Sequence, residues 1–112
     1  MLTQKIILRG IGVSPGRVEE RVKMITFPEE IDGINEKRII VTAFLFPDFL
    51  TSIKRNNLIS GIITENGGLT CHASIITREL GIPYIAGARL ATRRLKENMI
   101  ITIDGEGGGN LR

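Results

Sequence analysis

The sequence of 112 residues contains one cysteine, one histidine, no tryptophan and five other aromatic side chains. A single cysteine, Cys71, excludes an internal disulfide, which agrees with a reducing compartment. One histidine and one cysteine leave a tetrahedral metal centre short of its usual ligands, so we expect no metal site. The few aromatic residues are not interleaved with a basic stripe, and we therefore expect no nucleic-acid binding.

The chain also lacks long hydrophobic runs. None approaches the roughly 18 to 20 apolar residues that cross a bilayer, and residues 1–5 do not resemble a signal peptide. We expect a cytoplasmic protein that does not bind membranes. Hydrophobic residues make up 42% and charged residues 24%, with no biased tract. This composition predicts one globular domain over residues 1–112, with a buried core and no room for a second catalytic domain.

The net charge of +3 favours acidic partners only weakly, because fifteen Lys and Arg residues are scattered among twelve Asp and Glu residues. The densest basic group comprises Arg89, Arg93, Arg94 and Lys96. This group is either a solvated face or a docking or phosphate-binding patch, and the sequence leaves both interpretations open.

Alternating and β-branched runs predict strands over residues 18–24, 38–43, 60–64, 84–86 and 99–103. Helices are expected from Pro47 to about Asn56, over 73–80 and, for at most two turns, within 90–95. Residues 27–37 are expected to be loop and turn. The strand over 18–24 places Glu20 on its apolar side, so the strand is at an edge there or Glu20 has a partner.

The helix over 73–80 is expected to point Ala73, Ile76 and Leu80 toward the core. Gly81 is its expected left-handed cap residue. The strand, helix and strand before it predict a unit whose crossover is right-handed.

The only histidine, His72, lies between a Gly-Gly turn and this helix. A neutral imidazole is a competent nucleophile near pH 7 and can carry a phosphoryl group. A helix start offers backbone N–H groups and a positive dipole end to an anion, and the Thr70 hydroxyl can bond a phosphoryl oxygen. The candidate phosphate-binding residues are Gly67, Gly68, Cys71, Ala73 and Ser74.

Local chemistry leaves other interpretations open. His72 can be a partly buried structural residue and Thr70 a plain N-cap. Phosphorylation of Thr70 can instead act as an off switch, because a dianion close to His72 repels an incoming phosphoryl group. A Cys71–His72 nucleophilic pair is disfavoured because adjacent residues seldom face each other and no orienting third group is evident. Cys71 is expected to be a small packed residue.

The run GGLTCHASIITRELGIPYIAG over residues 67–87 resembles the phosphohistidine signature of phosphoenolpyruvate-utilising enzymes. Its Thr-Cys-His triplet is most similar to the phosphoenolpyruvate synthase branch. Residues 12–16 are similar to the opening motif of that family, 39–48 to its strand and Pro-Asp segment, and 103–105 to its closing strand and turn. Glu20 departs from the pattern, because the family commonly has a small residue there.

The resemblance implies the swivelling β/β/α phosphohistidine domain, a mostly parallel central sheet with a smaller antiparallel sheet. It implies that His72 is the phosphoryl carrier and that Thr70 is a phosphoryl contact or regulatory phosphosite. The implied partners are an ATP-binding, ATP-grasp-like subunit, a barrel subunit for phosphoenolpyruvate or pyruvate, and a regulatory kinase. ATP and Mg²⁺ are expected on the partners, and no cofactor is expected on this domain.

These implications predict a free-standing carrier subunit of a split phosphotransferase, incomplete as an enzyme alone. Two alternatives remain from the sequence: a non-catalytic binding module that retains the carrier surface, and an excised piece of a larger dikinase. The sequence does not identify the final phosphoryl acceptor.

Overall fold

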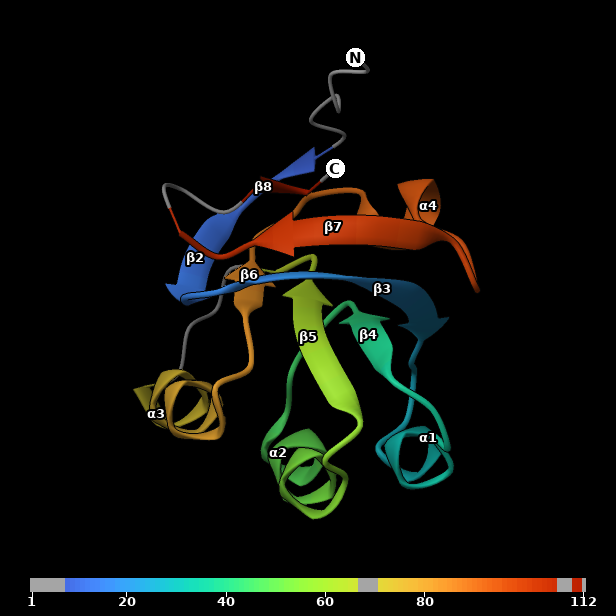
Figure 1. Cartoon of the computed structure of the whole chain (residues 1–112), viewed down its shortest axis with the longest axis vertical. Coiled ribbons are helices and arrows are strands. Elements are labelled where there is room, and N and C mark those ends of the chain that lie inside the picture. The colour runs from blue at the N-terminus through green and yellow to red at the C-terminus, as the bar shows by residue number, and fades with distance from the viewer. Residues whose placement is uncertain (1–7, 67–70, 107–109, 112) are drawn as a thin grey trace.

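Figure 1 shows the computed structural model of the chain, which describes residues 8–66, 71–106 and 110–111. The strands are β1 (Leu8–Arg9), β2 (Ile11–Ser14), β3 (Arg17–Met24), β4 (Arg38–Thr42), β5 (Ile59–Thr64), β6 (Tyr84–Ala86), β7 (Ile100–Asp104) and β8 (Asn110–Leu111). The helices are α1 (Glu29–Asp32), α2 (Pro47–Arg55), α3 (Cys71–Leu80) and α4 (Ala91–Arg94). No helix in these ranges is both long and apolar enough to cross a membrane.

The strands form one mixed sheet in the order β1-β8-β7-β3-β4-β5-β6-β2. The pairings β3/β4, β4/β5 and β5/β6 are parallel, as expected for the centre. The expected second, smaller antiparallel sheet is wrong for the described ranges, because β7, β8 and β1 continue the parallel part through β3. β3 is long enough to pair β7 with residues 17–21 and β4 with residues 22–24, so one strand joins both parts.

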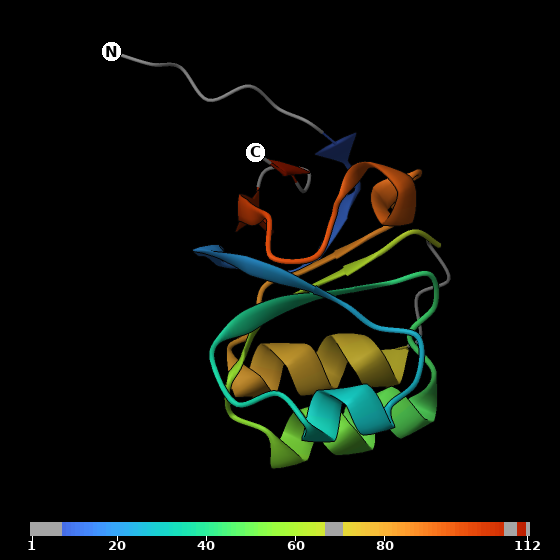
Figure 2. The same cartoon turned by 90° about the vertical axis from the view of Figure 1, so that its right-hand side faces the viewer.

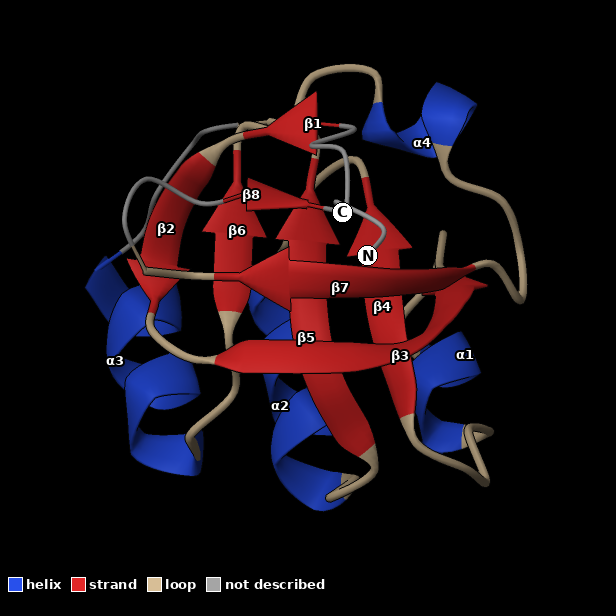
Figure 3. Ribbon diagram, turned by 45° about the horizontal axis from the view of Figure 1, so that its top comes forward, coloured by secondary structure: helices blue, strands red, loops and turns tan. Residues whose placement is uncertain are grey.

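The curl of the sheet creates two cores. Helices α1, α2 and α3 cover one face of the parallel strands, whereas α4 and β7 lie on the other side (Figure 1). Figure 3 shows β3 and β7 running across β4, β5 and β6. Ile31, Ile53 and Ile76 fill the helix-side core, and Val22, Leu95 and Ile103 fill the core under β7. The continuous apolar run of β4 supplies both cores, because all four of its residues from Ile39 to Thr42 are buried.

Glu20 lies where β3 pairs with β7 through Ile101 and has no strand pairing to β4. Its side chain is half-buried, and one carboxylate oxygen accepts a hydrogen bond from the Arg21 N–H at 3.3 Å. The expectation of an edge strand is wrong for the described pairings, because β3 lies between β7 and β4 in the sheet, although Glu20 itself is paired only on the β7 side.

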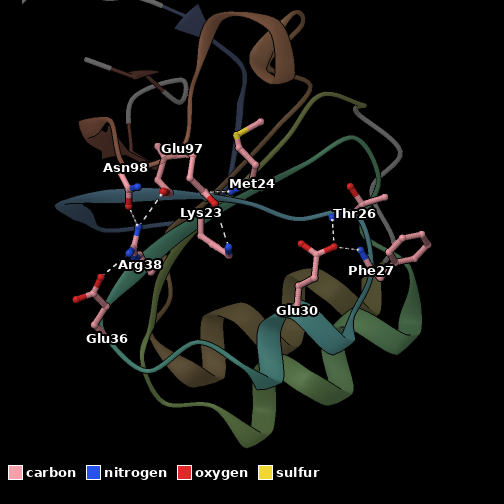
Figure 4. A network of polar contacts seen from close by, with 10 residues as sticks. Lys23, Met24, Thr26, Phe27, Glu30, Glu36, Arg38, Glu97 and Asn98 are labelled. Carbon is pink, nitrogen blue, oxygen red and sulfur yellow. Dashed lines mark hydrogen bonds and ion pairs between the residues drawn. The ribbon is translucent and has the colours of Figure 1, made fainter.

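The expectation of loop and turn over residues 27–37 is wrong at Glu29–Asp32, which form the short helix α1. The Glu30 carboxylate accepts hydrogen bonds from the N–H groups of Thr26 and Phe27, at 3.3 and 3.2 Å (Figure 4). This side chain fixes the turn that starts the helix, and Ile31 is fully buried beneath it. Four residues give too short a period for sequence patterning to reveal.

A network of hydrogen bonds and ion pairs lies at the start of β4. Figure 4 shows Arg38 donating to the Asn98 side chain at 2.5 Å and forming an ion pair with Glu36. Glu97 accepts from the Met24 N–H at 2.7 Å and pairs with Lys23 at 3.0 Å. Burial raises the pKa of Glu97, but these hydrogen bonds and positive charges outweigh it and lower the pKa overall.

Candidate functional site

The predicted phosphoryl site lies at the edge where the parallel strands end. Figure 2 shows the ends of β4 and β5, the starts of α2 and α3, and α4 on the same side of the molecule. This is the edge at which open parallel sheets place ligands, because loops and helix starts converge there. The topology therefore brings His72 to a position that suits ligand chemistry.

Hydrogen bonds to three neighbouring elements hold the end of β5, which leads into the signature. The Thr64 hydroxyl donates to the Asn66 carbonyl at 3.0 Å and lies 3.3 Å from the Tyr84 hydroxyl. Asn66 donates to the Ala43 carbonyl through both its N–H and its side-chain amide, at 3.1 and 2.9 Å. The Glu65 carboxylate accepts from the Thr92 hydroxyl at 2.7 Å. The chain therefore leaves β5 from a fixed point tied to β4, β6 and α4.

Helix α3 presents His72 to solvent. The side chain of His72 is exposed in the first turn, whereas Ala73 and Ile76 are buried against Tyr84 and the rest of the helix-side core. Ile75, one turn beyond His72, is 52% exposed. The imidazole is thus reachable by a visiting active centre, which is the condition that a carrier must meet.

The far end of α3 is capped as predicted and holds the helix in place. Gly81 has φ of +69°, its N–H donates to the Arg78 carbonyl at 3.2 Å, and the Ile82 N–H donates to the Thr77 carbonyl at 2.9 Å. These two bonds form a Schellman cap. The Arg78 side chain also donates to the Val13 carbonyl in β2 at 3.1 Å.

The expectation that Leu80 faces the core is wrong, because its side chain is 44% exposed. The Schellman cap turns the chain back so that Ile82 is buried instead. Thr77 takes the remaining inward position, with its hydroxyl bonded to the Ala73 carbonyl at 2.8 Å. The apolar spacing of a helix predicts which of its residues face the core, but it does not predict that the chain reverses direction at the cap.

The structure describes only some of the other predicted site residues. Gly67, Gly68 and Thr70 lie outside the described residues, as does the side chain of Cys71. Ala73 is buried, so its methyl group is part of the core, and Ser74 is half-buried. The roles of all these residues in binding phosphate stay predictions. Sequence reasoning missed Glu65 and Asn66 as anchors, although polar residues directly after a buried strand are the signal that could have found them.

The described residues place an exposed imidazole in the first turn of α3. The first turn of a helix of this length has N–H groups beyond the reach of its own carbonyls, and the dipole places positive potential there. Among the described side chains, no three His, Cys, Asp or Glu residues gather to hold a metal ion. The geometry leaves the His72 imidazole open to a molecule that approaches from solvent.

Tyr84, which lies beneath this site, gives a pH prediction. Burial raises the pKa of Tyr84 above its ordinary 10.0, and the hydrogen bond to Thr64 offsets this in part. Because the folded state disfavours tyrosinate, stability is complete below pH about 10 and falls as the pH rises toward the folded pKa. Tyr84→Phe is expected to lose about 1 kcal/mol at neutral pH and to show a smaller alkaline loss.

Urea unfolding at pH about 8 and about 11 checks this prediction. The chain has no tryptophan and no second tyrosine, so tyrosinate absorbance follows this group alone. Equal alkaline losses of stability in the wild type and Tyr84→Phe would contradict it.

Residues 34–108 match the family described as PEP-utilising enzyme, mobile domain, and these residues make up most of the chain. The chain belongs to this family. The resemblance seen in the signature is thereby confirmed for the mobile domain as a whole, including β4, β5 and α3. Within the described ranges, six strands of three or more residues, with helices α1, α2 and α3 on one face, form the α/β framework that carries the signature.

A curated relative of this mobile domain is a probable phosphoenolpyruvate synthase from Archaeoglobus fulgidus, 44% identical over 104 residues. The match covers 93% of this chain and 13% of that protein. The chain spans only 12 to 15% of the length of the first such relatives it matches. The likeness is therefore to one part of those proteins.

Solved structures share the fold. An Enzyme I protein studied in solution has a TM-score of 0.64 and 26% identity, covering 73% of this chain and 32% of that chain. Aconitase X of Thermococcus kodakaraensis, in its holo form, also has a TM-score of 0.64, with 20% identity, and covers 92% of this chain and 95% of that chain. The second likeness is one of fold alone.

Proposed function

We propose that this mobile domain is a phosphoryl carrier that works with partner proteins as part of a phosphoenolpyruvate synthase-like phosphotransferase. His72 accepts a phosphoryl group from an ATP-binding partner and passes it to an acceptor such as pyruvate on a second partner. The observation that carries the proposal is that the only histidine is exposed at the start of α3, inside the matched family region.

The proposed chemistry has two steps. One imidazole nitrogen attacks phosphorus, so that a nitrogen–phosphorus bond forms while the bond to the donor oxygen breaks. The acceptor oxygen then attacks the same phosphorus, so that an oxygen–phosphorus bond forms, the nitrogen–phosphorus bond breaks and the imidazole of His72 is the leaving group. Positive potential at the start of α3 stabilises the phosphoryl oxygens in both steps. Gly67, Gly68, Cys71 and the amides of the first turn are proposed to contact the phosphoryl group.

The test is transfer of radioactive phosphate from ATP. The chain is incubated with Mg²⁺, ATP and full-length phosphoenolpyruvate synthase of Archaeoglobus fulgidus, whose partner regions we expect to accept a mobile domain 44% identical to its own. One acid-labile, base-stable phosphoryl group per chain is expected on His72. Adding pyruvate is expected to remove it. Absence of label on the chain while the synthase is active would contradict the proposal.

Thr70 is proposed as the regulated position beside the carrier. A phosphate placed there by a partner kinase adds negative charge near His72 and is expected to slow its phosphorylation. A Thr70→Glu chain is therefore expected to be labelled more slowly than a Thr70→Ser chain in the same assay.

A further inference from the structure

Ile75 is an exposed apolar side chain close to the proposed carrier. It is 52% exposed, whereas the next residue, Ile76, is 4% exposed and packs in the helix-side core. The two isoleucines therefore point to different sides of α3, and the contact with the core is made by Ile76. In the second turn of the helix, residues 74–77, Ile75 is the exposed member, because Ser74 is half-buried and Thr77 is buried.

The fold itself gives little reason for an isoleucine at this position. Isoleucine is β-branched and forms helices less readily than alanine, lysine or glutamate, which are the residues that an exposed helix position favours. Figure 1 shows α3 at the end of the row formed by α1, α2 and α3, so α3 has a helix beside it on one side only. The exposed side chain of Ile75 is therefore free to contact another protein.

Helix geometry places Ile75 directly beside His72, which is also exposed on α3. Residues three apart are neighbours on a helix surface, with Cβ atoms about 5 to 6 Å apart. Side chains tilt toward the start of their helix, so the side chain of Ile75 leans over the turn that contains His72. We call His72 and Ile75 together the carrier face.

The polar side chains that follow on α3 are turned away from the carrier face. The Arg78 guanidinium, one turn beyond Ile75, donates to the Val13 carbonyl at 3.1 Å and so lies toward β2. The Thr77 hydroxyl donates to the Ala73 carbonyl at 2.8 Å within the helix. A protein that reaches His72 along this helix therefore meets the apolar side chain of Ile75 first.

We propose that Ile75 is a docking residue, covered by the apolar rim of each active centre that exchanges a phosphoryl group with His72. This inference rests on the proposed function. Transfer requires the reacting atoms to lie about 3 to 3.5 Å apart, so a side chain one turn from His72 lies inside the interface during both half-reactions. Burial of Ile75 strengthens binding, and because Ile75 takes no part in the chemistry it lowers KM without changing the maximal rate.

The test measures KM and maximal rate for the chain as a substrate of Archaeoglobus fulgidus phosphoenolpyruvate synthase. Charging of His72 uses ATP and Mg²⁺. Discharge to pyruvate starts from a chain loaded with phosphoramidate, a small molecule that phosphorylates exposed histidine without docking. Ile75→Ser is expected to raise KM about tenfold in both half-reactions and to keep the maximal rate within about twofold. Its phosphoramidate labelling is expected to proceed at the wild-type rate.

Leu80→Ser is the matched control. Leu80 is 44% exposed and ends the same helix, about 12 Å along the axis from His72. Its KM is expected to stay within about twofold of wild type. Ile75→Val keeps a β-branched apolar side chain and is expected to retain a KM within about threefold of wild type. Serine and isoleucine have similar helix propensities, so urea unfolding is expected to show that Ile75→Ser is folded.

The outcomes separate the two proposals. A wild-type KM for Ile75→Ser in either half-reaction would overturn the docking inference and leave the carrier function intact. Slower phosphoramidate labelling, or a lower maximal rate at unchanged KM, would show that Ile75 acts on the imidazole itself and would also overturn the inference.

Two further results bear on the occupant of the carrier face. A wild-type dimer that Ile75→Ser converts to monomer would assign Ile75 to a second copy of the chain and overturn the docking inference. Failure of the synthase to charge the wild-type chain, with phosphoramidate labelling of His72 retained, would overturn the proposed function and the docking inference with it.

Discussion

The His72→Ala chain is expected to take up no phosphoryl group from ATP and the synthase, because no other imidazole is present to replace it. The loss is expected to be complete rather than partial, since the proposed function makes His72 the nucleophile that carries the phosphoryl group and not a positioning residue. Because the side chain is exposed, the free energy of unfolding is expected to change by less than about 0.5 kcal/mol. Radiolabelling and urea unfolding measure the two quantities on the same preparation.

Glu79→Ala provides the control, because Glu79 is also exposed on α3 but lies two turns beyond His72. It is expected to be charged at the wild-type rate. The comparison also separates a carrier from a regulatory binding module. If a partner's activity depends on this chain and His72→Ala leaves that dependence intact, the carrier function is wrong.

Gly12→Ala and Gly105→Ala are expected to be strongly destabilising, because both glycines lie where backbone approaches backbone closely. A Cβ on Gly12 would overlap the carbonyl oxygen of Gly105, and one on Gly105 would overlap that of Ser14. Both obstacles are backbone, so relief requires the strands to separate. The Gly105 N–H also donates to the Gly16 carbonyl at 2.8 Å. We expect each substitution to cost about 3 kcal/mol or more, measured by urea unfolding.

Two other glycines serve as controls. A Cβ on Gly33 would lie 3.7 Å from its nearest neighbour, the Glu30 carbonyl oxygen, so Gly33→Ala is expected to be neutral or slightly stabilising. Gly81 has open space around it but φ of +69°, so Gly81→Ala is expected to cost about 1 kcal/mol through backbone strain. If Gly12→Ala costs no more than Gly81→Ala, the close approach of β2 to the end of β7 is wrong.

Much of this fold could be predicted because its central helices and strands have clear patterns of apolar residues, and proline or glycine marks where the helices begin or end. The continuous apolar run of β4, Pro47 at the start of α2 and Gly81 after α3 each determine local structure by themselves. The continuity of the sheet could not be predicted, because the pairing of Arg17 with Asp104 joins residues far apart in the chain. No local pattern encodes such a pairing.

The position of His72 at a helix start could be predicted from the glycine turn and the apolar stripe after it. The environment that holds it could not. The Asn66 side chain donates to the Ala43 carbonyl, and the Glu65 carboxylate accepts from the Thr92 hydroxyl. Both hydrogen bonds depend on tertiary structure. The exposure of Phe44 and Phe46 could not be predicted for the same reason, because an apolar side chain is expected in the core until the structure shows that it remains outside.

The antiparallel pairing of β1 with β8 brings Leu8 opposite Leu111, so the first and last strands of the described chain lie together. A unit built in this way can be spliced into a longer polypeptide at a single point, with its incoming and outgoing segments side by side. This architecture explains in physical terms how a segment of this size can make up 12 to 15% of much larger relatives while keeping its own core.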